Sequence, residues 1–305
     1  MSNALIVFRQ TVIMFLYMAV GFTLFRAKLI TREGSASMAS LLLYAIIPVV
    51  LIQSFQVEYS AEKAAELLSS SLAAVVLLLA SMLISHLCFR KNPVNDFGVA
   101  FSNAGFMGFP LITALLGPEA IFSAAGFVAL LNALQWTYGQ YLLSGDKGDL
   151  SLKKTLRSPL ILSFLLGLAL FFARVKIPPI LGGAMNGLAA MNAPLAMVVL
   201  GVYLAQLDVK RALRDARLYA GAAVRLLLIP AVSLLLLRFL FPGLTPSTRT
   251  ALFIAAMAPV GANVAVYAQK QGRDYSYAVG LVCLSTLLSI VSMPLMILLS
   301  ELMGG

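Results

Sequence analysis

The sequence is poor in charged residues. Asp, Glu, Lys and Arg make up 11% of the 305 residues, whereas 61% are hydrophobic. A soluble domain carries roughly 25% charged residues, so this chain has too little charge to cover a surface that faces water. Hydrocarbon is the solvent that suits such a composition. The shortage of charge therefore excludes a soluble globular protein and indicates a polytopic membrane protein.

Histidine, cysteine and intramembrane acids are also scarce. The chain has one histidine, His86, and two cysteines, Cys88 and Cys283, which stand in apolar segments without the spacing of a metal site or a disulfide. All 12 acidic residues fall in predicted loops or near predicted helix ends. We therefore expect no metal, no other cofactor and no enzyme active site. A cation antiporter that works through a buried carboxylate is disfavoured for the same reason.

The formal net charge of +10 would suit a nucleic-acid partner. The basic residues lie in short loops between apolar runs, however, and not among aromatic residues on one polar face, as in a nucleic-acid interface. Basic loops of this kind set the orientation of a membrane protein. We expect the lipid bilayer, and no nucleic acid, around this chain.

Ten apolar runs approach the length of about 20 residues that a helix needs to cross the hydrocarbon core. They predict an all-α membrane protein with ten transmembrane helices and no sheet. In the first run the basic residues follow the apolar stretch, which indicates a retained helix and not a signal peptide. The predicted helices cover residues 4–25, 36–56, 65–89, 96–117, 119–144, 156–173, 184–206, 217–241, 247–270 and 275–300.

Lys and Arg are distributed unequally between the two sides of this arrangement. The loops after the odd-numbered predicted helices hold 15 of them, and the loops after the even-numbered helices hold 4. Because positive loops stay in the cytoplasm, this bias places both termini outside the cell or in the periplasm. The expected location is the inner (plasma) membrane, which the chain crosses many times.

The positions of proline indicate an internal repeat. Pro48 in the second helix and Pro194 in the seventh are 146 residues apart, and Pro110 in the fourth and Pro259 in the ninth are 149 apart. Because five helices are an odd number, the second copy would be inverted in the membrane. The alternative is that proline is simply common in membrane helices. The predicted five-helix repeats are residues 1–150 and 151–305.

The fourth and ninth predicted helices each carry proline, glycine and asparagine close together near mid-span. Proline removes a backbone donor and glycine tolerates open conformations, so we expect both helices to break there. Since unpaired backbone groups are costly in hydrocarbon, the breaks must face protein or a watery cavity. Half-helix N-termini at the midplane would hold an anion without a cationic side chain; alternatively, the breaks only shape the bundle. The residues are Asn103, Gly105, Gly108 and Pro110 in the fourth helix, and Pro259, Gly261 and Asn263 in the ninth.

Several other polar residues within the predicted spans are candidates for function. Arg225 stands about eight residues into the eighth helix, where it would attract anions from the cytoplasm or snorkel towards the interface. Asn132, Gln135 and Tyr138 share one face of the fifth helix, either as site residues or as interhelical contacts. His86 has no acidic partner within its span, which favours interfacial packing over a proton relay.

Several of these segments resemble the motifs of one family. The run Asn103-Ala-Gly-Phe-Met-Gly-Phe-Pro-Leu111 is similar to the fourth-helix motif Asn-x4-Gly-x-Pro-Leu of the auxin efflux carrier family, which includes plant auxin exporters and bacterial permeases for malate or malonate. The resemblance covers the whole chain. Further similar runs are Pro259-x-Gly261 with Val266-Tyr-Ala268, Arg225-x4-Pro230, Trp136-Thr-Tyr138 and Ser285-Thr-x2-Ser289-x4-Pro294.

The resemblance implies two inverted five-helix repeats in which the fourth and ninth helices cross at Pro110 and Pro259. It implies a homodimeric scaffold domain of the first, second, sixth and seventh helices, and a transport domain of the other six that moves like an elevator. The expected substrate is a small organic anion, a mono- or dicarboxylate, that contacts Asn103 and Asn263 at the crossing. The residues expected to line the site are Leu51, Gln53, Asn132, Gln135 and Tyr138.

The sequence also departs from the family pattern. Val264 stands where plant members often carry a second proline, and the long central loop of many plant exporters is absent. Auxin itself is therefore an unsafe expectation for the substrate. A sodium-coupled organic-anion symporter is the nearest alternative, because carbonyl and hydroxyl oxygens would hold sodium, and proton coupling also stays open. A channel or a non-transporting receptor is the more distant alternative.

Overall fold

The structure, a computed structural model, describes residues 2–150, 156–207, 212 and 214–303. Among these residues every regular element is helical, and the one strand-like pairing is an isolated bridge between Ser102 and Val260. The all-helical fold class is confirmed for this part of the chain. The predicted junction of the two repeats adjoins residues 151–155, which lie outside the described residues, as does Asp208.

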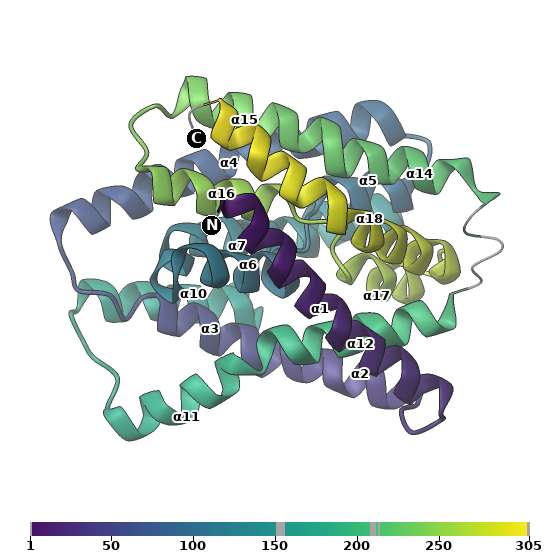
Figure 1. Cartoon of the computed structure of the whole chain (residues 1–305), viewed down its shortest axis with the longest axis horizontal. Coiled ribbons are helices and arrows are strands. Elements are labelled where there is room, and N and C mark those ends of the chain that lie inside the picture. Colours follow the sequence, from purple (N-terminus) through teal and green to yellow (C-terminus); the bar gives the residue numbers. More distant parts are fainter. Residues whose placement is uncertain (1, 151–155, 208–211, 213, 304–305) are drawn as a thin grey trace.

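Figure 1 shows the arrangement of the helices. Up to residue 150, α1 and α4 are uninterrupted α-helices, whereas three other segments each contain a π-helical turn. In the second predicted segment a π-helical turn, η1, precedes Pro48, which stands in the first turn of the next helix. The elements are α1 (Asn3–Arg26), α2 (Arg32–Leu41), η1 (Leu42–Ile46), α3 (Ile47–Ser54), α4 (Ala61–Phe89), α5 (Pro93–Ala100), η2 (Ala104–Gly108), α6 (Phe109–Leu116), η3 (Pro118–Ala120), α7 (Ile121–Leu134), η4 (Gln135–Gly139), α8 (Gln140–Ser144) and η5 (Lys147–Asp149).

The helices after residue 155 follow the same pattern. A π-helical turn, η6, again precedes a proline, Pro230, and the ninth predicted segment is again two short helices. The elements are α10 (Pro159–Phe172), α11 (Pro179–Ala190), α12 (Asn192–Gln206), α14 (Ala216–Ala223), η6 (Val224–Leu228), α15 (Ile229–Leu240), α16 (Pro246–Met257), α17 (Asn263–Lys270) and α18 (Tyr275–Leu302).

Seven helices of the described chain are long and apolar enough to cross a membrane. Two further apolar helices, Ala104–Leu116 and Pro159–Phe172, are shorter. The fold is therefore that of a multi-pass membrane protein, and the total of ten crossings stays a prediction. Three predicted segments are missing from this count. The fourth and ninth are interrupted by non-helical residues, as expected from their prolines and glycines, and the described helix of the sixth, Pro159–Phe172, has only 14 residues. The seven are Asn3–Arg26, Arg32–Ser54, Ala61–Phe89, Pro118–Ser144, Pro179–Gln206, Ala216–Leu240 and Tyr275–Leu302.

Short polar side chains fix where the helices begin. At the start of α4 the Ser60 hydroxyl accepts a hydrogen bond from the N–H of Lys63, and at the start of α5 the Asn92 side chain accepts one from Asn95. Such caps satisfy N–H groups that have no partner inside the helix. The same role belongs to Thr31, Ser158, Thr245 and Asp274.

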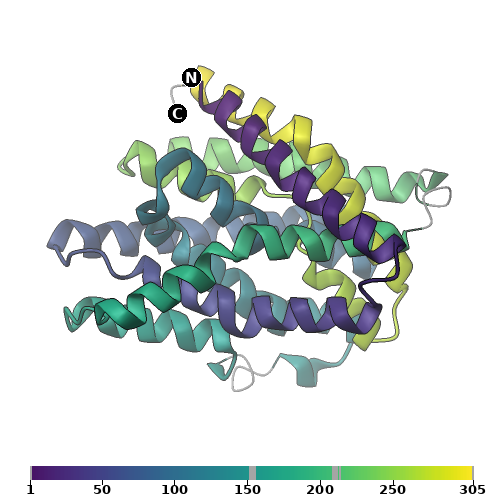
Figure 2. The ribbon, with the colours of Figure 1, turned by 60° about the horizontal axis from the view of Figure 1, so that its bottom comes forward.

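The two ends of the chain lie side by side. Figure 2 shows α1 running along α18, and the N–H of Asn3 donates to the Glu301 carboxylate over 3.1 Å. On another face α1 packs against α12 so closely that an ideal Cβ at Gly201 would lie 2.0 Å from the carbonyl oxygen of Met18. A Cβ at Gly21 would lie 2.1 Å from the carbonyl oxygen of Val198. Small residues allow membrane helices this close approach.

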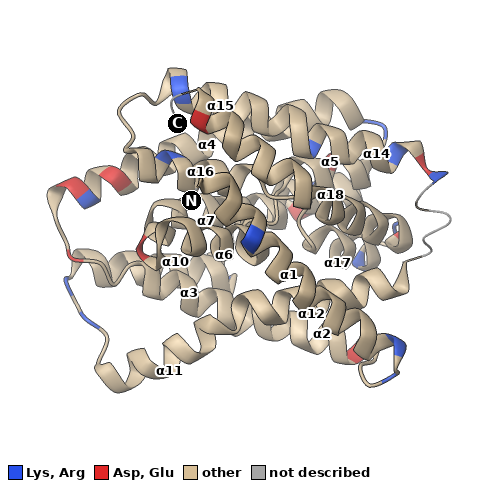
Figure 3. Ribbon diagram, viewed as in Figure 1, with Lys and Arg blue, Asp and Glu red and all other residues tan. Residues whose placement is uncertain are grey.

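Charged residues of both signs lie mainly towards the two ends of the long axis of the molecule. Figure 3 shows most Lys, Arg, Asp and Glu residues towards the two ends of this axis, with few across the middle. Many large apolar side chains, such as Leu16, Leu83, Phe239 and Leu302, are exposed on the helices between those ends. An apolar surface band with charged rims is the arrangement that a bilayer requires.

We expect Gly201→Val to lower the melting temperature of the detergent-purified protein by several degrees, because any Cβ forces α1 and α12 apart. Overpacking of this kind typically costs about 1–3 kcal/mol. Gly187→Val, in α11, is the matched control, since no atom of a neighbouring element lies within 4 Å of its ideal Cβ. Thermal unfolding followed by fluorescence compares the two variants, and equal melting temperatures would contradict the tight α1–α12 contact.

Candidate functional site

The two helix breaks meet and pair with each other. Ser102 and Val260 form an antiparallel bridge, the N–H of Asn103 donates to the carbonyl oxygen of Pro259 over 2.8 Å, and the N–H of Gly261 donates to that of Phe101 over 3.0 Å. Unpaired backbone groups are costly in hydrocarbon. The broken helices therefore cross where each break satisfies the other.

Four helix ends converge on this crossing. Residues 101–103 lie between the C-terminus of α5 and the first residue of η2, and residues 258–262 lie between the C-terminus of α16 and the first residue of α17. Helix C-termini carry partial negative charge and N-termini partial positive charge. The crossing thus brings together two partially positive N-termini and two partially negative C-termini. Their electric field would act on any ion bound there.

Glycines allow the two breaks to approach. An ideal Cβ at Gly261 would lie 3.1 Å from the carbonyl oxygen of Ser102, and one at Gly108 would lie 3.6 Å from the Cα of Ala255 in α16. A Cβ at Gly105 would lie 3.3 Å from the side chain of Ile47, so helix α3 packs directly on the break. The glycines predicted from sequence thus stand where backbone meets backbone or a neighbouring helix.

Arg225 is buried beside the crossing, with 1% of its surface exposed. Its Nε donates to the carbonyl oxygen of Ala258 over 3.0 Å, its Nη1 to that of Val99 over 3.1 Å and to the Ser81 hydroxyl over 3.3 Å, and its Nη2 to the carbonyl oxygen of Ala256. All four partners are neutral oxygen atoms. The side chain neither snorkels to the interface nor contacts the cavity described next.

A large cavity of about 1210 Å³ opens against α6, the helix that follows the first break, although residues 101–103 and 258–262 do not line it. It lies between α3, α6, α11 and the first turn of α12, and the start of α4 completes its wall. Pro110 of the broken helix contributes to the lining, together with the side chains of Gln53, Asn186 and Asn192. Two lysines and two glutamates also line it: Lys63, Lys176, Glu58 and Glu119.

Several buried polar atoms near the crossing have no hydrogen-bond partner among the described residues. They include the Nδ2 donor of Asn103, which is 5% exposed, and the hydroxyl of the adjacent Ser102. The side chain of Asn192 is half satisfied: its Nδ2 donates to the carbonyl oxygen of Gly105 over 3.0 Å, whereas its Oδ1 accepts nothing. Because an unsatisfied buried polar group is costly, such atoms commonly mark a functional site.

A family model for membrane transport proteins matches residues 6–297. The chain belongs to this family. It is a transport protein and not an enzyme, and the match confirms the resemblance to the auxin efflux carrier family. A protein of Methanothermobacter thermautotrophicus named "Uncharacterized transporter" is 30% identical over 202 residues, which cover 64% of each chain and thus just under two thirds of the relative's length. A protein of Rhizobium meliloti named "Putative malonate transporter" is 27% identical over 243 residues, which cover 75% of each.

The structure brings only part of the predicted site together in this transport protein. At the crossing, the Asn263 Nδ2 donates to the Gln135 Oε1 over 2.9 Å, and the Nε2 of Gln135 would lie 3.3 Å from a Cβ at Gly261. Gln53 instead lines the cavity and donates to Asn186 over 2.7 Å. The others do not join these groups: Asn132 bonds to Val128 within its own helix, Leu51 is fully buried, and Tyr138 packs against the core.

Sequence reasoning missed Asn186, Asn192 and the two cavity lysines. Asn192 did carry a signal, because it stands two residues before Pro194, the proline that pairs with Pro48 in the predicted repeat. Lys63 and Lys176 were counted only as loop charges. Their position on a cavity wall depends on which helices pack together, and no local pattern encodes that.

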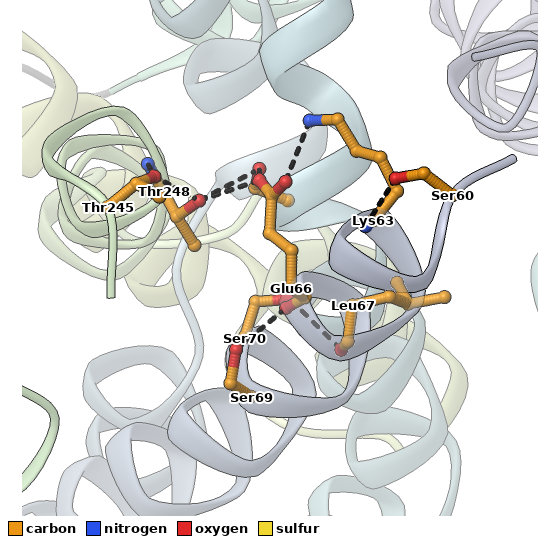
Figure 4. Close-up of polar contacts among 9 residues, drawn as sticks. Ser60, Lys63, Glu66, Leu67, Ser69, Ser70, Thr245 and Thr248 are labelled. Atoms are coloured by element: carbon orange, nitrogen blue, oxygen red, sulfur yellow. Dashed lines mark hydrogen bonds and ion pairs between the residues drawn. The ribbon is translucent and has the colours of Figure 1, made fainter. Parts of the chain in front are cut away.

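The carboxylate of Glu66, in α4, binds the cavity residue Lys63 of the same helix and side chains of two other helices, α7 and α16. Its Oε1 accepts from the Ser123 hydroxyl of α7 over 2.6 Å and from the Thr248 hydroxyl of α16 over 2.7 Å, and its Oε2 lies 2.7 Å from the Nζ of Lys63 (Figure 4). Each oxygen of the carboxylate is therefore occupied by α4, α7 or α16. This network holds Lys63 at the wall of the cavity and ties α16 to α4 and α7 near its start.

His86 has an acidic partner outside its own helix. Its Nδ1 lies 2.8 Å from the Oδ2 of Asp96, which stands at the start of the next predicted helix and is 1% exposed. The reason is the turn at residues 90–92, which folds α5 back along α4 and brings the start of one helix against the end of the other. The pair lies outside the crossing.

We expect Asn192→Leu to destabilise the transport protein, because the part-buried carbonyl group of Gly105 would lose its donor. Leaving such a group unsatisfied costs about 1–3 kcal/mol. Asn186→Leu is the matched control: its side chain lines the same cavity, but the residue is exposed, so its effect should stay within about 0.5 kcal/mol. Melting temperatures in detergent measure both variants. A larger loss for Asn186→Leu would contradict the role of Asn192 at the break.

Proposed function

We propose that the protein is a secondary transporter of a small organic anion, a mono- or dicarboxylate, that binds at the crossing of the two broken helices. The observation that carries this proposal is the convergence of two helix N-termini with a buried, unpartnered amide donor, Asn103 Nδ2. Helix N-termini attract negative charge, and an N–H donor is the natural partner of a carboxylate oxygen.

The cavity supplies the route to this site. Its lining includes Pro110 of the break and Asn192, which bonds to the break at Gly105. Its lining also includes Glu58, Tyr59 and Lys176, residues of loops that the positive-inside bias assigns to the outside. In this conformation the substrate would therefore reach the crossing from the outer side. The relative named as a malonate transporter makes a dicarboxylate the first class to test.

The transport mechanism proposed with this site is elevator-type alternating access within ten transmembrane helices arranged as two inverted repeats. Both domains predicted from the sequence contribute to the cavity wall: α3, α11 and α12 on the scaffold side, α6 and α4 on the transport side. Movement of one domain along the other would close this cavity and open another. The scaffold would pair as a homodimer, and light scattering that finds only a monomer mass would reject that part.

Four alternatives would behave differently in transport and binding assays. A sodium-coupled symporter would lose uptake when sodium is replaced by choline, and a proton-coupled one would lose it when the proton gradient is collapsed. A channel would show no counterflow, the accelerated uptake of labelled substrate into vesicles loaded with unlabelled substrate. A receptor would bind the anion without moving it.

We expect a panel of carboxylates, including malonate, malate and indole-3-acetate, to contain at least one that raises the melting temperature of the purified protein and enters proteoliposomes above the background of empty vesicles. Asn103→Ala should abolish both effects. The substitution removes the free Nδ2 donor but leaves the backbone bond from Asn103 to Pro259 in place, so the crossing is retained.

Asn132→Ala is the matched control for this experiment, because Asn132 is a buried asparagine that bonds only within its own helix. It should keep the response to carboxylates. A panel that stabilises neither protein would speak against an organic anion as substrate. A carboxylate that stabilises wild type and Asn103→Ala equally would place the binding site away from the crossing.

We expect the two sides of the membrane to follow the positive-inside bias. In a background with Cys88 and Cys283 replaced by serine, Gly243→Cys should react with a membrane-impermeant maleimide in intact cells, and Lys147→Cys should react only after the membrane is opened. Both residues are exposed. Labelling in the reverse order would invert the proposed orientation and the side on which the cavity opens.

A further inference from the structure

The charge of Arg225 is the least expected feature of the crossing. Arg225 is the largest fully buried side chain of the described chain, and it lies in η6, within the apolar segment Ala216–Leu240. An arginine in the middle of a membrane helix costs about 2.5–3.5 kcal/mol on insertion scales. None of its hydrogen-bond partners among the described residues carries a formal negative charge. Something other than an ion pair must stabilise the guanidinium.

Its partners are the free ends of two helices. Val99 lies in the last turn of α5 and Ala256 in the last turn of α16, while Ala258 follows α16 directly. Carbonyl groups in a last turn have no partner within their helix, and together they form the negative pole. Through Nε, Nη1 and Nη2 the guanidinium bridges both poles, and the Ser81 hydroxyl connects it to the carbonyl of Ala100 over 2.7 Å.

The bridge also determines what Arg225 can do for a substrate. A guanidinium has five N–H donors, and four hydrogen bonds to protein oxygens use all but one of them. Direct contact with an anion that enters through this cavity is therefore not the role that its geometry favours.

We propose that Arg225 is a fixed counter-cation of the crossing: it neutralises the two helix C-termini, so that the two N-termini remain as the uncompensated, positive poles. It is thus a positioning residue that makes the crossing selective for an anion, and it occupies the place where carbonyl oxygens would otherwise attract a cation. This inference rests on the proposed anion site for its effect on binding, but its effect on the helix ends is independent of any substrate.

The test compares Arg225→Met with the matched control Arg238→Met, whose arginine is exposed on the same apolar segment. Melting temperatures are measured in choline chloride and again with sodium chloride or a low, non-denaturing concentration of guanidinium chloride, at equal ionic strength. Arg225→Met should melt lower than wild type in choline and recover part of the loss with sodium or guanidinium. Wild type and Arg238→Met should show no such cation dependence.

A second measurement follows the carboxylate that stabilises wild type. In choline, Arg225→Met should bind it about tenfold more weakly, the order expected when partly buried helix poles lose a charge partner, and sodium or guanidinium should restore affinity. Affinity equal to wild type, or a stability loss indifferent to cations, would overturn the proposal. If wild type binds no carboxylate, the proposed function fails, whereas the cation dependence of Arg225→Met still decides this inference.

Arg225→Lys covers the case in which Arg225→Met does not fold. Lysine retains the charge but has three donors on one atom and no planar fork. The lysine variant should fold and bind the carboxylate without an added cation. Its melting temperature should be below that of wild type and, where Arg225→Met can be purified, above that of Arg225→Met. A lysine variant that requires sodium as the methionine variant does would show that the shape of arginine matters and its charge does not, which overturns the counter-cation role.

Discussion

The structure depends on one constraint: inside a bilayer, every backbone N–H and C=O group must find a partner within the protein. A continuous helix meets this requirement alone, but a helix broken by proline and glycine does not. This chain has two such breaks, and each supplies the other with hydrogen bonds, from Asn103 to Pro259 and from Gly261 to Phe101. Neither break would be tolerated without its counterpart. The pairing of the two breaks therefore fixes the positions of α5, α6, α16 and α17 relative to one another.

The same pairing creates an uneven electrostatic environment. Four helix ends meet, and the two negative ends are occupied by the guanidinium of Arg225. The N–H donor of Asn103 is left without a protein partner, next to the start of η2. An ion site in a membrane usually relies on a charged side chain that contacts the ion. Here the charged side chain contacts the helix C-termini instead, and the favourable interaction with an anion would come from backbone poles and amide groups.

The sequence predicted the parts that local chemistry controls. Apolar length predicted the helices, polar caps such as Ser60 and Asn92 explain where they begin, and the proline and glycine clusters marked both breaks. The partners of buried polar groups were not predictable, because they come from distant segments. Arg225 bonds to residues more than 30 or 120 positions away, and Asn192 to Gly105, 87 positions away. His86 and Asp96 are only 10 residues apart, but they stand in different predicted helices. The tight turn between α4 and α5 reverses the chain and brings the two side chains together.

The cavity shows how few direct bonds hold the two proposed domains together at the substrate route. The hydrogen bond from Asn192 to Gly105 joins a helix of the proposed scaffold to the break of the proposed transport domain. Gln53 and Asn186, also at this boundary, bond to each other and both belong to the scaffold. By contrast, Glu66 joins α4, α7 and α16, which all belong to the transport domain. A polar bond exchanged for water costs about 1 kcal/mol, whereas breaking a charged network within a domain costs more. At the cavity, a charged network within the transport domain and a single neutral bond from it to the scaffold are what sliding of one body along the other would require there.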